Sequence, residues 1–232
     1  MRHAFPAAVL FLTACRMAGF AQTQAGFLAP APTLAEPVVN QPYSADLVAE
    51  TVQILADGST ATRTIPNLRL YRDSAGRTRT DGPILLNPES GVETVVMVVI
   101  VDPVAGFQYV LDPRRRVAHR RPLEAPAPSP AATAQAPARP RLTSEPMGSQ
   151  WLEGVSVQGV RLTLAHPAPS QTEYWMSPDL QVMVLQRRID PQGGEASNRL
   201  THIVRAEPDV TLFAPPADYT AVDETSDIRI LP

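Results

Sequence analysis

The chain has 232 residues, with 20 Lys or Arg, 23 Asp or Glu and a single Cys. All 20 cations are Arg, and a chain without Lys excludes Schiff-base chemistry on a lysine, a phosphate-loop lysine and a lysine general base. The formal net charge of −3 offers no long-range attraction to nucleic acid, whose binding depends on neutralising phosphates.

The first 21 residues follow the order of a secretory signal. Arg2 and His3 precede an apolar stretch over residues 5–14, which is too short for a membrane-spanning helix of roughly 20 residues. Residues 12–15 resemble a bacterial lipobox, in which Cys15 is acylated, whereas residues 19–21 suit an ordinary signal peptidase. We therefore expect a periplasmic or extracellular protein, which contacts the membrane only through a lipid on Cys15 if that site is used.

Two segments of low complexity divide the rest of the chain. Residues 22–41 predict a flexible tether, and residues 122–146, with seven Pro and seven Ala, predict a disordered linker, because they bury too little apolar surface to offset their ordering entropy. The linker separates residues 42–121 from residues 147–223, which precede a tail over 224–232. Each half alone has a marginal size, so we favour one sheet built from both halves over two small domains.

The first half is dominated by strand patterns. Residues 43–55 predict a long edge strand, although Glu50 falls on the same face as Val48, Val52 and Ile54. Residues 95–101 are seven consecutive apolar side chains, mostly β-branched, and predict a central strand. A turn after Asp102 and an alternating run over 107–111 complete a hairpin.

The second half repeats this organisation. Apolar and polar residues alternate over 160–165, 180–184 and 200–205, and a loop over 190–194 separates the last two runs. A short helical turn is expected at 208–213, where Pro suits the first position. The predicted fold class is mainly β: a curved antiparallel meander sheet or half-open β-barrel with short helical turns and a disordered Pro/Ala-rich insertion.

Four stretches carry a resemblance to a known family: residues 71–79, 102–113, 175–180 and 212–219. They resemble secreted bacterial proteins of unknown function, which are similar to the half-open β-barrels of the periplasmic lipoprotein carriers and the related sigma-factor regulators. The resemblance implies a curved antiparallel sheet around an apolar hollow that holds acyl chains. The chain differs from the carriers in its Pro/Ala insertion and in having no evident long helix, and no functional residue is transferred.

Six aromatic residues are placed where strands or the closing segment fill an interior: Phe107, Tyr109, Tyr174, Trp175, Phe213 and Tyr219. Core packing accounts for such a set, and the alternative is that some of them line a ligand pocket. The candidate ligand-binding residues are Phe107, Tyr109, Tyr174 and Trp175.

A cluster of five guanidinium groups occupies the expected third arm over residues 114–121. Its members are Arg114, Arg115, Arg116, Arg120 and Arg121. Such a cluster can bind an anion or an acidic partner through the planar guanidinium fork, or it can be a solvated edge strand whose charge discourages aggregation.

Candidate catalytic groups are few. His119, His166 and His202 are too far apart in sequence for the close spacing usual at zinc sites, and no metal site is predicted. His166 and His202 continue apolar strand faces and support a hydrolase only if one of them meets a carboxylate or Ser in a cleft.

The function predicted from the sequence is an exported, non-catalytic binding module without a cofactor. It holds a lipid or another hydrophobic ligand in a concave sheet. The alternatives are an envelope protein-interaction or regulatory module that uses a sheet edge or the cluster from Arg114 to Arg121, and a hydrolase that uses His166 or His202.

Overall fold

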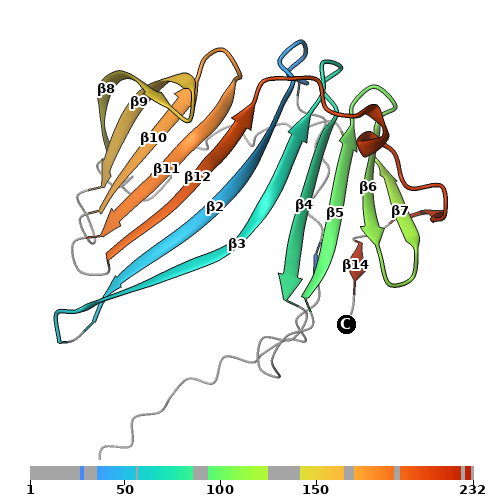
Figure 1. Ribbon diagram of the computed structural model, residues 1–232, viewed down its shortest axis with the longest axis horizontal. Coiled ribbons are helices and arrows are strands. Elements are labelled where there is room, and N and C mark those ends of the chain that lie inside the picture. Colours follow the sequence, from blue (N-terminus) through green and yellow to red (C-terminus); the bar gives the residue numbers. More distant parts are fainter. Residues whose placement is uncertain are drawn as a thin grey trace, which may run out of the picture.

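Residues 27–28, 36–55, 57–85, 94–124, 142–164, 170–190, 194–225 and 228–230 are described by the structure, a computed structural model. Twelve of their strands form one sheet in the order β13-β7-β6-β5-β4-β3-β2-β12-β11-β10-β9-β8. All neighbours in this sheet are antiparallel except β13 and β7. Figure 1 shows an open, curved layer, and this confirms the predicted fold class.

Two meanders make up the sheet. The first contains β2 (Tyr43–Ile54), β3 (Thr60–Arg72), β4 (Thr78–Leu85), β5 (Thr94–Asp102), β6 (Phe107–Asp112) and β7 (Val117–Pro122). The second contains β8 (Leu142–Leu152), β9 (Val155–Leu164), β10 (Ser170–Ser177), β11 (Val182–Asp190) and β12 (Gly194–Val204). They are followed by the 3-10 helix η1 (Val210–Phe213) and β13 (Thr220–Asp223), and a separate pair joins β1 (Phe27–Leu28) to β14 (Arg229–Ile230).

The two meanders meet at β2, which is a central strand and not the predicted edge strand. It pairs with β3 on one side and with β12 on the other, where Leu47 lies opposite Leu200. Glu50, which interrupts the apolar face of β2, is exposed, as is Ile54 at the far end of the strand. A solvated side chain therefore does not mean an unpaired backbone here, because hydrogen bonds to neighbouring strands run within the plane of the sheet.

The predicted hairpin of the first meander is confirmed as β5 and β6. Asp102 closes its turn by accepting hydrogen bonds from the backbone amides of Val104 and Ala105, both at 2.9 Å. Asp112 does the same at the next turn, towards the amides of Arg114 and Arg115 at 2.9 and 3.1 Å. Short carboxylates favour such turns because they bond the backbone two or three residues ahead.

Buried side chains form separate clusters along the sheet. One comprises Tyr43, Ala45, Val155, Val157, Trp175, Leu180, Val184 and Leu200. Another comprises Val98, Ile100, Leu111 and Ala118, with Tyr109 and Tyr219 packed against it. The helix η1 follows Asp209, whose carboxylate accepts from the amide of Thr211, and it buries Phe213. This confirms the short helical turn expected at 208–213.

Strands also occupy parts of the segments expected to lack structure. β8 begins at Leu142, inside the range 122–146, while residues 125–141 lie outside the described residues. β1 lies inside the expected tether, and β14 inside the expected tail, where Ile228 is also buried. The last five residues of the expected linker, 142–146, are therefore part of β8.

Candidate functional site

The turn between β3 and β4 is the point around which the candidate site is built. Asp73 is buried and accepts hydrogen bonds from the backbone amide of Arg77 at 2.8 Å and from its Nε at 2.6 Å. Gly76 has a φ of 83°, a conformation that favours glycine. The turn is thus fixed from within by one carboxylate and one glycine.

The N-terminal segment, residues 36–40, crosses this turn closely. The amide of Asn40 donates to the carbonyl of Ser74 at 2.9 Å. A Cβ on Gly76 would lie 2.9 Å from the Cβ of Pro37 and 3.3 Å from the carbonyl oxygen of Val38. Any larger side chain at this position would therefore push the segment away from the sheet.

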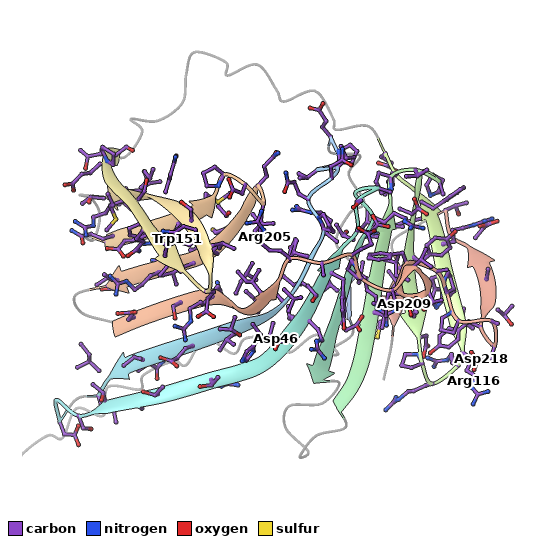
Figure 2. All side chains as sticks on the ribbon, turned by 45° about the horizontal axis from the view of Figure 1, so that its top comes forward. Asp46, Arg116, Trp151, Arg205, Asp209 and Asp218 are labelled. Atoms are coloured by element: carbon purple, nitrogen blue, oxygen red, sulfur yellow. The ribbon has the colours of Figure 1, made fainter. Side chains whose placement is uncertain are left out.

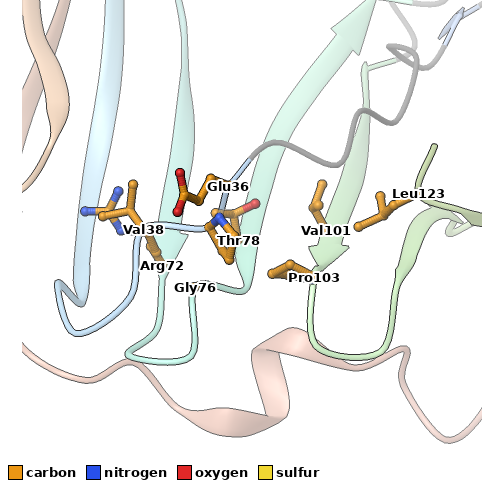
Figure 3. Close-up of a pocket in the computed structure, with 9 residues that line it drawn as sticks. Glu36, Val38, Arg72, Gly76, Thr78, Val101, Pro103 and Leu123 are labelled. Carbon is orange, nitrogen blue, oxygen red and sulfur yellow. The ribbon is translucent and has the colours of Figure 1, made fainter. Parts of the chain in front are cut away.

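A pocket of about 220 Å³, here called the N-terminal pocket, lies between this segment and the sheet (Figure 3). Its walls come from the N-terminal segment, from the ends of β3, β4 and β5, and from the residues after β5 and β7. The lining residues are Glu36, Pro37, Val38, Arg72, Gly76, Thr78, Val101, Pro103 and Leu123. Its lining is mostly apolar, with Glu36, Arg72 and Thr78 as the polar exceptions.

Arg72 links this pocket to the second meander. Its side chain is buried and donates from Nε to the carbonyl of Gln41 at 3.0 Å and from Nη2 to the carbonyl of Leu180. Its guanidinium also lies 4.8 Å from the centre of the Tyr43 ring. Burial lowers the pKa of Arg72 and raises the pKa of Tyr43, because it disfavours the charged form of each group.

The segment after β12 fixes the outer side of the same turn. The carboxylate of Glu207 accepts hydrogen bonds from the amide and hydroxyl of Ser74, and these bonds lower the pKa of Glu207. The guanidinium of Arg79 donates to the carbonyl of Leu212 at 2.9 Å, and Arg77 lies 5.3 Å above the ring of Phe213. The segment before β2 and the segment after β12 therefore both contact the turn between β3 and β4.

A row of charged side chains crosses the second meander. Glu173 is only 2% exposed and accepts hydrogen bonds from Arg161 at 3.0 Å and from Arg187 at 2.8 Å. Burial alone would raise its pKa, but the two guanidinium groups outweigh burial and lower it. Beyond Arg187, a second pocket of about 230 Å³ is lined by Val48, Glu50, Leu185, Arg187, Glu195, Ser197 and Arg199. Its charged lining suits polar ligands better than an alkyl chain.

The four predicted ligand-binding aromatics do not line either pocket. Trp175 is buried over Gly159, where an added Cβ would lie 2.6 Å from the indole ring. Tyr109 packs against a core cluster, and the Phe107 ring lies 6.5 Å from the Tyr109 ring. Tyr174 is partly exposed on β10. Core packing is thus the observed role of Trp175 and Tyr109.

The five arginines of the predicted anion or partner patch do not form one free surface. Arg115 pairs with Asp112 at 2.9 Å, Arg116 with Asp218 at 3.5 Å and Arg120 with Asp223 at 2.6 Å. Arg121 is buried and donates to Gln108 at 3.0 Å, and Arg114 also has an interaction within the chain. Arg121 follows Arg120 directly in β7, so its side chain lies on the opposite face of the strand, where it is buried.

The histidines are also dispersed. His119 Nδ1 lies 2.7 Å from Glu224, and His202 Nδ1 lies 3.0 Å from Asp46. The His202 side chain is 80% exposed, so this pair stands on the surface and not in a cleft. His166 and Cys15 lie outside the described residues.

Two further observations on the described residues concern metal ligands and membrane-spanning helices. Among the described residues, no three His, Cys, Asp or Glu side chains are grouped as metal ligands. Within those ranges there is also no helix with the length and apolar character needed to cross a membrane.

Sequence reasoning missed the residues that line the N-terminal pocket. Val38, Val101 and Leu123 come from distant parts of the chain, and no local spacing connects them. Glu173 left no clear local signal either, because Gln171 and Ser177 on the same face of β10 are also polar.

No protein-family model matches the sequence, and no curated protein matches it. Similar solved structures include an uncharacterized conserved protein from Thermus thermophilus (TM-score 0.43, 12% identity, 79% of this chain and 91% of that chain). Another is MucB in the MucA/MucB complex of Pseudomonas aeruginosa (TM-score 0.42, 13% identity, 79% of this chain and 58% of that chain), so the chain spans less than two thirds of that protein. A third is a LolA superfamily protein from Nitrosomonas europaea (TM-score 0.28, 8% identity, 77% of this chain and 92% of that chain). The similar structures therefore include proteins described as a LolA superfamily protein and as a putative outer membrane lipoprotein-sorting protein domain.

Proposed function

We propose that the protein is an exported, non-catalytic binding module that holds an apolar chain of a hydrophobic ligand in the N-terminal pocket. The observation that supports this most directly is the mostly apolar lining of that pocket, to which Pro37 and Val38 of the N-terminal segment and Val101, Pro103 and Leu123 contribute. Export is the expectation from residues 1–21.

The volume of the pocket suggests how much of a ligand enters it. About 220 Å³ is less than the roughly 300 Å³ at which ligand sites usually begin. The pocket therefore suits a single alkyl chain better than a whole lipid. The lining carries one carboxylate, Glu36, and one guanidinium, Arg72, so a ligand with a neutral head group tests the apolar contacts alone.

A series of n-alkanols tests this proposal, since each is neutral and differs from the next by one methylene. Each buried methylene contributes about 0.8 kcal/mol, so the Kd should fall about fourfold per carbon until the pocket is full. Displacement of a fluorescent apolar probe from the full chain measures these constants. The absence of saturable displacement, or equal affinity for all chain lengths, would contradict the proposal.

Two neighbouring substitutions locate the site. Val38 lines the pocket, whereas Val39 does not line it and is 47% exposed. Val38→Trp should fill the space and weaken alkanol binding at least tenfold, while Val39→Trp should bind like the wild type. Melting curves of both variants show whether the fold is retained, and Leu123→Trp provides a second filling variant on the opposite wall. Wild-type binding by both filling variants would place the ligand elsewhere.

A further inference from the structure

The two edges of the sheet differ in how they are protected. At one edge, β8 carries Pro146 and a register shift between Pro146 and Gly148, where Gly148 has a φ of 79°. A proline and a bulge interrupt the row of backbone groups that an added strand would need. At the other edge, β7 pairs regularly with β6 and meets β13 on its outer side. Protection there comes from a segment of the chain itself.

β13 pairs with β7 in a parallel register, with Thr220 opposite Val117 and Asp223 opposite Arg120. The amide of Thr220 donates to the carbonyl of Arg116 at 2.9 Å, and the amide of Glu224 donates to the carbonyl of Arg120 at 2.8 Å. An extended segment is therefore already bound by β-strand addition, the mode by which many domains take up peptides.

Three acidic side chains of this segment face three basic side chains of the edge. Asp218 lies 3.5 Å from Arg116, and Figure 2 shows both at the end of the sheet. Asp223 binds Arg120 through two contacts of 2.6 and 3.0 Å, and Glu224 lies 2.7 Å from His119.

The Arg120 guanidinium is held in place from behind. It lies 4.7 Å from the centre of the Phe107 ring, while its forked contacts point outward to β13. A planar guanidinium fixed in this way prefers a carboxylate that can accept two parallel hydrogen bonds. The edge therefore discriminates in favour of acidic segments.

Burial contributes little to the hold on β13. All four of its side chains are exposed, and exposed ion pairs stabilise a structure by at most about 1 kcal/mol each. The firm attachments lie outside the strand, at Tyr219, which packs against a core cluster, and at Ile228, which is buried. The strand itself is therefore held by its backbone pairing with β7 and by exposed ion pairs.

We propose that the outer edge of β7, with Arg116, His119 and Arg120, is an interaction surface for an extended acidic segment of another protein, and that β13 occupies this edge in its absence. This inference goes beyond the proposed function and does not depend on it. A separate protein fits better than a second copy, because exchanging β13 between copies would uproot Tyr219 and Ile228 as well.

A synthetic peptide with the sequence of residues 217–225 tests the surface. The full chain is compared with a triple variant, Asp218→Asn, Asp223→Asn and Glu224→Gln, in which β13 keeps its shape but loses its charges. Fluorescence anisotropy of the labelled peptide should show at least tenfold tighter binding to the triple variant, because the competing segment in the chain is weakened. This binding should decrease as salt is added, since the pairs are exposed.

Matched controls separate recognition from a general change of charge. A second triple variant, Glu145→Gln, Glu153→Gln and Asp179→Asn, has the same net charge but an intact β13, and it should bind the peptide like the wild type. Adding Arg120→Gln to the first variant should abolish the gain, and a peptide with its acids replaced by amides should not bind. Melting curves verify that each variant is folded.

Two results would overturn the proposal. One is equal binding of the acidic and the neutral peptide by the triple variant, or no binding of either. The other is a dimer of the triple variant or of the wild type in size-exclusion chromatography that dissociates when peptide is added. That result would show that the edge binds a second copy of the chain.

Discussion

Glu173 is the buried charge whose removal should be most informative. In the wild type, Arg161 and Arg187 bind the Glu173 carboxylate at 3.0 and 2.8 Å. In Glu173→Gln, both guanidinium groups would face a neutral amide. Removing one partner of a buried ion pair costs about 3 to 5 kcal/mol, and exposed pairs contribute up to about 1 kcal/mol. The Arg161 and Arg187 side chains are 31% and 40% exposed, so water can solvate them in part. We therefore expect Glu173→Gln to lower the free energy of unfolding by about 2 to 3 kcal/mol, between those limits.

The effect should depend on pH in a defined direction. The folded state lowers the pKa of Glu173, so the unfolded chain takes up its proton first as the pH falls. The stabilisation is fully present above the unfolded value of about 4.3 and is lost as the pH falls through the folded pKa. The difference between wild type and Glu173→Gln should therefore be constant near pH 7 and shrink below about pH 4.

Urea unfolding followed by circular dichroism at pH 7 and at pH 3 measures both quantities. A loss of 2 to 3 kcal/mol corresponds to a fall in Tm of roughly 4 to 12 °C for a chain of this size. Glu145→Gln is the matched control, because this carboxylate is 68% exposed and 3.7 Å from Arg161, and its effect should stay within about 0.5 kcal/mol. Equal stability of wild type and Glu173→Gln at pH 7, or an equal loss in the control, would refute the reasoning.

Three further substitutions examine packing and capping. Gly159→Ala should destabilise the protein by about 1 to 3 kcal/mol, because the new methyl group would lie 2.6 Å from the Trp175 ring; a melting curve identical to that of the wild type would contradict this contact. Phe213→Ala should lower the free energy of unfolding in urea by about 3 to 5 kcal/mol, because its side chain is buried. Val210→Ala in the same helix should lower it by less than about 0.5 kcal/mol, because Val210 is 62% exposed. Similar losses in both variants would show that η1 does not pack as described. Asp209→Ala removes the cap of η1 and should cost about 1 kcal/mol, measured in the same way, with an unchanged midpoint as the opposing result.

Local patterns predicted much of the fold. The β-branched run over 95–101 is β5, the turn after Asp102 closes a hairpin, and the helical turn expected at 208–213 is η1. These features depend on neighbours in sequence: turn carboxylates bond the next amides, and alternation follows the geometry of a strand. These features can therefore be predicted from the sequence without knowledge of the partner strands.

Features that depend on distant partners were predicted less well. β2 was expected at an edge, yet it pairs with β3 on one side and with β12 on the other, and the local pattern of residues 43–55 does not reveal the second partner. The N-terminal pocket is lined by both Val38 and Leu123, which are far apart in sequence. Arg116 and Arg120 likewise pair with Asp218 and Asp223, about 100 positions further along the chain. Contacts of this kind depend on the order of strands in the sheet, and a single sequence specifies that order only weakly.

The pairing of β2 with β12 also constrains how the chain can be made. The hydroxyl of Thr201 reaches the carbonyl of Asp46, a residue 155 positions earlier. Ribosomes add about 5 to 20 residues per second, so roughly 10 to 30 s separate the synthesis of these two strands. Until β12 is made, one side of β2 has no partner strand, and its amide and carbonyl groups are open to water or to another chain. This edge of the first meander closes only when the last long strand joins it.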